Sequence, residues 1–341
     1  MHQPKHTASL SISKTATEIE RSTPMSPSAA RYLKIGLEKA PNTVRAYRAD
    51  LNCYTRWCEQ HELTAFPATA EQVVNYLSEI AEHYKVATLG RRLAMLSSFH
   101  DLQNMESPTS SKLVRTAMDG IKRSKGIRQH QAPAMSMETF QEIILSFDEE
   151  SNTQLRDKIV LLLGFTGAFR RGELAALNVG DLLFDEEGIL VDVRQSKTDQ
   201  LGAGQLKAIF YASHPLLCPV RTIQRYLKRI YPATVQSPDM EKVSEDQARN
   251  SQPVLLRMRK GDRFGKTRLS DKSINLIVQR HFGSRFSAHS LRASFVTISK
   301  KNGASNSEIM AQTFHKTETM IRRYTRFEDA RTHNAGTKLG L

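Results

Sequence analysis

Apolar residues recur three and four positions apart along much of the first 125 residues, which is the spacing of one face of an α-helix. The runs cover 43–57, 70–84, 86–101 and 111–122. Asn42 and Thr69 stand at the start of the first two runs and are candidate N-caps, and Pro67 and Pro108 separate the runs. Because no alternating strand pattern occurs here, we expect an all-helical first domain over 27–125.

The polar stretch that follows has few apolar residues, and we place an interdomain linker at 126–136. Residues 1–26 are rich in Ser and Thr and contain no apolar run, which predicts a disordered arm rather than a signal segment. Residues 137–341 then form a second domain, and residues 232–252 within it are polar and predict a long loop.

One strand pair is evident in the second domain. Apolar residues alternate over 189–194 and again at Leu206, Ala208 and Phe210, and a polar, Gly-containing loop joins the two runs. This pattern predicts a β-hairpin. Helical spacing occurs before it and again over 215–231. The fold class is therefore mainly α, with a small β-hairpin in an α-rich second domain.

The charge of the chain indicates what kind of partner it binds. The 341 residues include 49 Lys and Arg against 35 Asp and Glu, a net charge of +14, divided as +6 over 1–130 and +8 over 131–341. We therefore expect both domains to touch a polyanion, most simply nucleic acid, although a basic enzyme without such a partner remains an alternative. No apolar run is long enough to span a membrane. Three scattered cysteines favour a reducing cytoplasm over a disulfide framework.

Two motifs imitate ligand sites without fitting them. Gly261–Thr267 reads GDRFGKT, which has three residues between its glycines where a phosphate-binding loop needs four. Cys53, Cys58 and His61 share a helical run, but no second ligand pair follows at the spacing of a zinc site. We expect neither a nucleotide nor a metal as cofactor.

Two pairs of residues three apart carry candidate chemistry. His289 and Arg292 lie near the start of an amphipathic helix. Arg170 and Glu173 follow a buried helix that Gly167 ends, and a buried arginine needs a carboxylate partner. Taken alone, each pair is equally consistent with a structural role.

Their order along the chain is more specific. It runs Arg170, Glu173, Lys197 in the hairpin loop, His289, Arg292, His315 and Tyr324. This order, with nine residues from His315 to Tyr324, resembles the tyrosine recombinase (phage integrase) family, and the helical first domain resembles that of its Cre-like members. The resemblance implies that Tyr324 is the nucleophile, that Glu173 supports Arg170, and that five basic side chains act on the phosphate. These are Arg170, Lys197, His289, Arg292 and His315.

The resemblance implies a site-specific DNA recombinase that cuts and rejoins strands through a 3′-phosphotyrosine, without metal or ATP. Two arginines would hold the charge on phosphorus. His289 is the favoured proton acceptor for Tyr324, and His315 a hydrogen-bond partner of the phosphate. Lys197 would protonate the leaving 5′-oxygen.

It also implies a C-shaped clamp on double-stranded DNA with inverted-repeat sites, and a cytoplasmic homotetramer on two sites joined by a docking helix after Tyr324. Expected DNA contacts are Arg45, Arg91, Arg92 and Lys272. A type IB topoisomerase and a catalytically silent DNA-binding protein remain alternatives.

Overall fold

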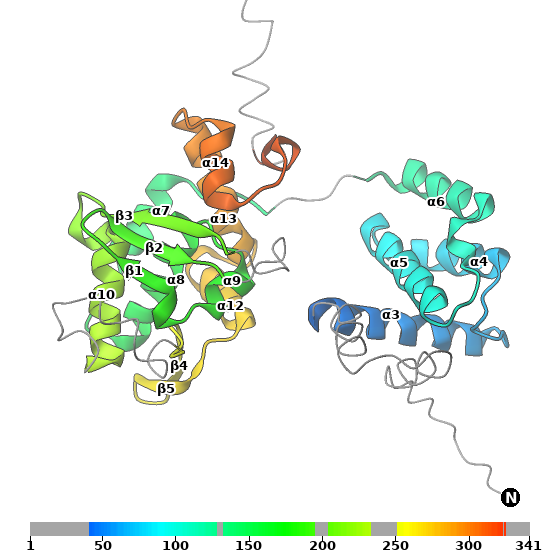
Figure 1. Ribbon diagram of the computed structural model, residues 1–341, viewed down its shortest axis with the longest axis horizontal. Helices are drawn as coiled ribbons and strands as arrows, with labels where there is room; N and C mark the ends of the chain where they lie inside the picture. Colours follow the sequence, from blue (N-terminus) through cyan, green and yellow to red (C-terminus); the bar gives the residue numbers. More distant parts are fainter. Residues whose placement is uncertain (1–40, 128–131, 195–203, 233–250, 323, 325–341) are drawn as a thin grey trace, which may run out of the picture. The chain divides into compact units, whose positions relative to one another are not determined.

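The computed structural model describes residues 41–127, 132–194, 204–232, 251–322 and 324. Contacts divide the chain into one unit within residues 1–129 and another within 130–341, and each is described by itself (Figure 1). The division falls inside the segment predicted as a linker. The predicted arm over 1–26 and the tail after Tyr324 lie outside the described residues.

Every described element of the first unit is helical, as predicted. These elements are α3 (Pro41–Gln60), α4 (Ala70–Ala81), α5 (Val86–Leu102), the 3-10 turn η1 (Pro108–Ser110) and α6 (Lys112–Lys125). Thr69 caps α4, since its hydroxyl accepts from the Gln72 amide at 3.2 Å. The predicted cap at Asn42 is wrong, because α3 already includes Pro41 and Asn42. The core gathers around Tyr54, Trp57 and Leu77.

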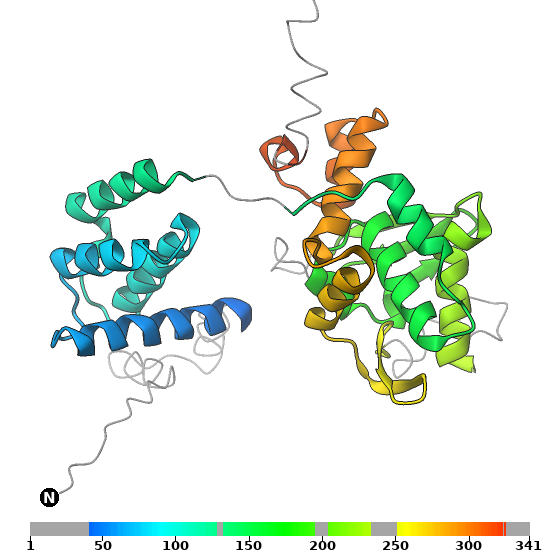
Figure 2. The ribbon, with the colours of Figure 1, turned by 180° about the vertical axis from the view of Figure 1, so that it is seen from behind.

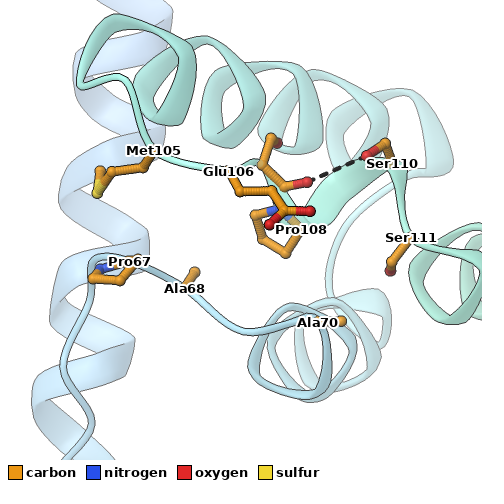
Figure 3. A pocket seen from close by; sticks show the side chains of 9 residues that line it. Pro67, Ala68, Ala70, Met105, Glu106, Pro108, Ser110 and Ser111 are labelled. Atoms are coloured by element: carbon orange, nitrogen blue, oxygen red, sulfur yellow. Dashed lines mark hydrogen bonds between the residues drawn. The ribbon is translucent and has the colours of Figure 1, made fainter.

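A hollow on this unit lies between the segment 67–70 and the segment 105–111 (Figure 3). Within the lining of this hollow, the Ser110 hydroxyl donates to the Ser107 carbonyl at 3.2 Å. Among the residues that line the hollow, Glu106 is the one ionisable side chain. The hollow therefore offers no cationic group for a phosphate.

The second unit is built around a central helix. Its helices are α7 (Met137–Leu145), α8 (Asn152–Thr166), α9 (Arg171–Ala176), α10 (Pro219–Ile230), α12 (Asp271–Phe282), α13 (Ala288–Lys301) and α14 (Asn306–Thr313), with 3-10 turns η2 (Val179–Asp181) and η3 (Pro215–Leu217). All side chains of α8 from Leu155 to Phe165 are buried, and α7, α9, α10, α12 and α13 pack on it (Figures 1 and 2). From Ile159 to Phe165 the helix carries no polar side chain on any face, and such a segment belongs at the centre of a domain.

Two small antiparallel sheets complete the unit. The first has the order β1 (Leu182–Phe184), β2 (Gly188–Asp192), β3 (Leu206–Phe210), and the second pairs β4 (Leu256–Arg259) with β5 (Arg263–Arg268). The predicted hairpin is confirmed as β2–β3, with Ile189 opposite Ile209. Strands β1, β4 and β5 were not predicted. The GDRFGKT motif lies in the β4–β5 turn and strand β5 rather than in a loop that opens a helix, which agrees with its rejection as a phosphate-binding loop.

Local signals at the ends of α8, α13 and α14 place the segments that matter for function. Gly167 caps α8, and Gly303 follows α13 with a φ of +90°. Ser305 and Glu308 form a capping box at the start of α14, with the Ser305 amide donating to the Glu308 carboxylate at 2.6 Å. Within the described residues, no helix is both long and apolar enough for a membrane span.

Candidate functional site

Arg170 is held at the entrance of α9. Its guanidinium Nη1 lies 2.5 Å from Glu173 Oε1, and its main-chain amide donates to Glu173 Oε2 at 2.9 Å. The Glu173 side chain is only 3% exposed, against 21% for Arg170. The predicted ion pair is therefore present, and the carboxylate uses both oxygens to fix one arginine.

Arg292 approaches the same region from α13 and is 1% exposed. Its Nη1 donates to the Ala168 carbonyl at 2.7 Å, and its Nη2 donates to the Thr313 carbonyl. Arg170 Nη2 donates to the next carbonyl, that of Phe314, at 3.5 Å. Burial, and then the charge of Arg170, lower the pKa of Arg292 to about 10, so it stays protonated at neutral pH. The two guanidiniums thus converge on the turn after α14.

Both turns that receive these arginines have an unusual backbone. Ala168 has a φ of +45° and Phe314 a φ of +56°, in the left-handed region that side chains disfavour. Each such residue costs on the order of 1–3 kcal/mol. Their carbonyls accept from Arg292 and Arg170 respectively, so the strained turns serve to aim acceptors at the two guanidiniums.

Tyr324 reaches this centre within a single chain. Its Oη lies 2.8 Å from His289 Nε2, and its ring stacks on His315 with centroids 5.8 Å apart and planes 20° apart. Its ring also packs on the small cluster formed by Val296, Ile309 and Ile321, where α13 and α14 meet. A candidate nucleophile, a candidate proton acceptor and a second imidazole are therefore adjacent.

Burial, reinforced by the neighbouring cations, favours the neutral form of both imidazoles. Burial, then Arg292 and Arg170, lower the pKa of His289. The same causes, together with His289 and Lys207, lower the pKa of His315 to about 3. A neutral ring at pH 7 is able to accept a proton, which is what an attack by a tyrosine hydroxyl requires.

Lys207 is the residue of this centre that sequence reasoning missed. It lies on β3 with no exposed surface, and its Nζ donates to the Gly167 carbonyl at 2.8 Å and to the Gln312 carbonyl. It also lies over the ring of Phe314, 4.3 Å from the centroid. Burial is the main cause that lowers the pKa of Lys207 to about 7.

The face of β3 explains the omission. The alternation of Leu206, Ala208 and Phe210 favours these as the inward residues, but Leu206 and Phe210 are 59% and 62% exposed, and Lys207 and Ile209 point inward instead. Lys207 and Ile209 are two residues apart and so lie on the same face of the strand, opposite buried β2 residues. That spacing from an apolar Ile could have indicated that Lys207 points inward. The predicted Lys197 lies outside the described residues.

The predicted DNA contacts differ in their surroundings. Arg45 and Lys272 are exposed, on α3 and in the first turn of α12. Arg91 is 44% exposed and pairs with Asp50 at 3.0 Å. Arg92 does not fit the prediction, because it is 3% exposed, donates to the Tyr76 hydroxyl at 2.8 Å and lies over the ring of Tyr84. Arg92 is buried because Tyr76, on the neighbouring helix α4, accepts its hydrogen bond inside the unit.

The structure also bears on metal binding. Within the described ranges, no three His, Cys, Asp or Glu side chains gather as a metal site would require. The candidate centre instead combines two guanidiniums, one lysine amine, one carboxylate, two imidazoles and a phenol. These groups are donors and proton acceptors suited to a phosphate ester.

Comparison with known proteins identifies the family. The model of the phage integrase family matches residues 134–331, and that of the phage integrase N-terminal SAM-like domain matches residues 30–104. An integrase/recombinase XerD homologue of Selenomonas ruminantium is 35% identical over 315 residues, covering 90% of this chain and 87% of the relative. Tyrosine recombinase XerC of Myxococcus xanthus is 24% identical over 295 residues, covering 84% and 87%.

Solved structures share the fold. XerH recombinase bound to its difH substrate has a TM-score of 0.55 at 14% identity, covering 86% of this chain and 79% of that one. A lambda integrase dimer bound to a core site has a TM-score of 0.53 at 15% identity, covering 95% and 81%. These likenesses confirm the mainly helical recombinase fold. With the family models and the XerD homologue, they show that this chain belongs to the phage integrase family of tyrosine-type site-specific recombinases.

Proposed function

We propose that this recombinase cuts and rejoins DNA through Tyr324, with a 3′-phosphotyrosine intermediate. The observation that carries the proposal is the 2.8 Å contact between Tyr324 Oη and His289 Nε2, beside two guanidiniums that converge on the same turn. A tyrosine hydroxyl is protonated at neutral pH and needs such an acceptor to attack.

Strand cleavage exchanges one phosphoester bond for another and moves two protons. Tyr324 Oη forms a bond to the scissile phosphorus as the bond from phosphorus to the 5′-oxygen breaks, and the phenolic proton passes to His289 Nε2. Lys197 gives a proton to the leaving 5′-oxygen. The reverse step, with a 5′-hydroxyl from another strand as nucleophile, rejoins the DNA.

The arginines stabilise the charge that builds up on the phosphate. A guanidinium has five N–H donors, and Arg292 uses two of its own on main-chain carbonyls. In the proposed reaction, donors of Arg292 and Arg170 that these contacts do not use bind the non-bridging oxygens. Removing such a donor costs on the order of 3–4 kcal/mol of transition-state stabilisation in comparable oxyanion sites.

The intermediate removes the need for ATP, because the phosphotyrosine keeps the phosphodiester linkage that rejoining uses. The cationic side chains take the place that a metal ion holds in other phosphoryl-transfer sites. The proposed reaction therefore uses neither cofactor.

The proposed substrate is double-stranded DNA with inverted-repeat sites. The net charge of +14, spread over both units, supports a clamp on duplex DNA, and the solved relatives are described as bound to a difH substrate and a core site. We extend the proposal to a homotetramer on two sites, with residues 325–341 docking between protomers, that acts in the bacterial cytoplasm.

The test begins with DNA recovered from cells. The chain is expressed in bacteria, covalently attached fragments are isolated under denaturing conditions, and their ends are sequenced to define a site. Two labelled copies of that site are then incubated with purified protein. Recombinant products support the proposal. Relaxation of supercoiled DNA without exchange would favour a topoisomerase, and binding without any covalent product would favour a silent DNA-binding protein; either result would refute it.

A further inference from the structure

Thr313 is the last residue of α14 and lies two residues before His315. Its side chain is fully buried. Thr313 Oγ1 lies 2.6 Å from the Ile309 carbonyl and 3.0 Å from His315 Nδ1. Its own carbonyl accepts from Arg292, so this one residue contacts two of the candidate catalytic side chains.

Counting protons gives the direction of each bond. A threonine hydroxyl has one proton, and the Ile309 carbonyl has none to give. At 2.6 Å, the Thr313 hydroxyl must therefore donate to the Ile309 carbonyl. Its bond to the imidazole can then form only if His315 Nδ1 carries a proton and donates it to Thr313 Oγ1.

A purely structural explanation covers only half of this arrangement. Threonines in helices often donate back to the carbonyl four residues earlier, and this accounts for the contact with Ile309. It does not explain why a free lone pair of Thr313 Oγ1 faces His315 Nδ1 at 3.0 Å. The imidazole is 6% exposed, so a mismatched pair of lone pairs at this position would be costly.

We infer that Thr313 is a positioning residue that sets the tautomer of His315, so that the neutral ring carries its proton on Nδ1 and presents Nε2 as an acceptor. The catalytic consequence rests on the proposed function. A neutral His315 in this tautomer has no N–H on Nε2 to offer a phosphate oxygen. His315 Nε2 must therefore take up a proton before it can donate to a phosphate oxygen, while Nδ1 stays bonded to Thr313.

The test compares two variants of the full chain. Thr313→Val keeps the shape of the side chain but removes the hydroxyl, and Thr313→Ser keeps the hydroxyl. Long-range nitrogen–proton NMR spectra of histidine side chains distinguish the tautomers, and loss of one set of signals in His315→Gln assigns them. We expect protonated Nδ1 in the wild type and in Thr313→Ser, and a mixed or reversed tautomer in Thr313→Val.

Cleavage provides the second readout. Outer partners that orient an imidazole are worth about 10–100-fold in activity in metal sites. We expect a loss of that size in the cleavage rate for Thr313→Val at unchanged DNA affinity, and near-full activity for Thr313→Ser.

Protonated Nε2 in the wild type would overturn the tautomer, even if Thr313→Val failed to fold. A reversed tautomer in a fully active Thr313→Val would overturn the role in catalysis. If the wild type cleaves no DNA but shows the expected spectrum, the proposed function fails while the positioning by Thr313 stands.

Discussion

Replacing Lys207 with methionine tests the electrostatics of the centre directly. Burial lowers the pKa of Lys207 from 10.5 to about 7. Between these two values the unfolded chain holds a proton that the folded chain has lost, so stability rises as pH rises. Below about pH 7 both states are protonated, and the full cost of burying the charge is present. Methionine does not titrate, so Lys207→Met lacks this dependence of stability on pH.

The magnitude follows from the shift. Each pH unit in this range changes the free energy of unfolding by about 1.4 kcal/mol, so the wild type gains up to roughly 3 kcal/mol over Lys207→Met between pH 7 and 9. The variant also leaves the Gly167 and Gln312 carbonyls without their donor, at about 1–3 kcal/mol each, but that loss does not change with pH.

The assay is urea unfolding from about pH 6 to about pH 9, followed by circular dichroism. The chain has one tryptophan, Trp57, in the first unit, and its fluorescence identifies that unit's transition separately. Lys272→Met removes an exposed lysine and is the matched control. We expect a pH-dependent difference for Lys207→Met alone. Parallel curves for the wild type and Lys207→Met across this range would refute the reasoning.

Further variants separate the proposed roles. Lys197→Ala should cleave poorly, and a 5′-thiol leaving group, which departs without a proton, should restore cleavage; an unrestored rate would remove Lys197 as the acid. Glu173→Gln should slow cleavage by about 10–100-fold at unchanged DNA affinity, because Arg170 loses its charged anchor; equal rates would make the ion pair dispensable. Arg45→Ala should reduce the slope of log affinity against log salt by about 1, whereas Arg92→Ala should lower the unfolding midpoint. Gel-shift and melting assays measure these two effects. A reduced salt slope for Arg92→Ala together with a lowered unfolding midpoint for Arg45→Ala would contradict the placement of the two arginines.

The helices of both units could be predicted because their signals are local. The cap at Thr69, the capping box at Ser305 and the stop at Gly303 each depend on a few neighbouring residues. The candidate centre could also be predicted, but for another reason: the order from Arg170 to Tyr324 matches a family pattern. Nothing in any single segment distinguishes a catalytic arginine from a structural one.

The errors come from contacts between segments distant in sequence. Arg92 reads as a surface cation until Tyr76 on another helix supplies its partner. Lys207 reads as the polar face of its strand until the carbonyls of Gly167 and Gln312 supply two acceptors in the interior. Strand β1 has only three residues, too few for an alternating pattern, and it forms because β2 lies beside it.

The most direct test of the account is the identity of the residue that becomes bonded to DNA. A nicked substrate that loses its 5′-hydroxyl fragment after cleavage would trap the intermediate, and peptide mapping by mass spectrometry would locate the nucleotide. The account predicts a single adduct on Tyr324, absent from Tyr324→Phe although that variant still binds the site. A nucleotide on any other side chain, or an adduct formed by Tyr324→Phe, would contradict it.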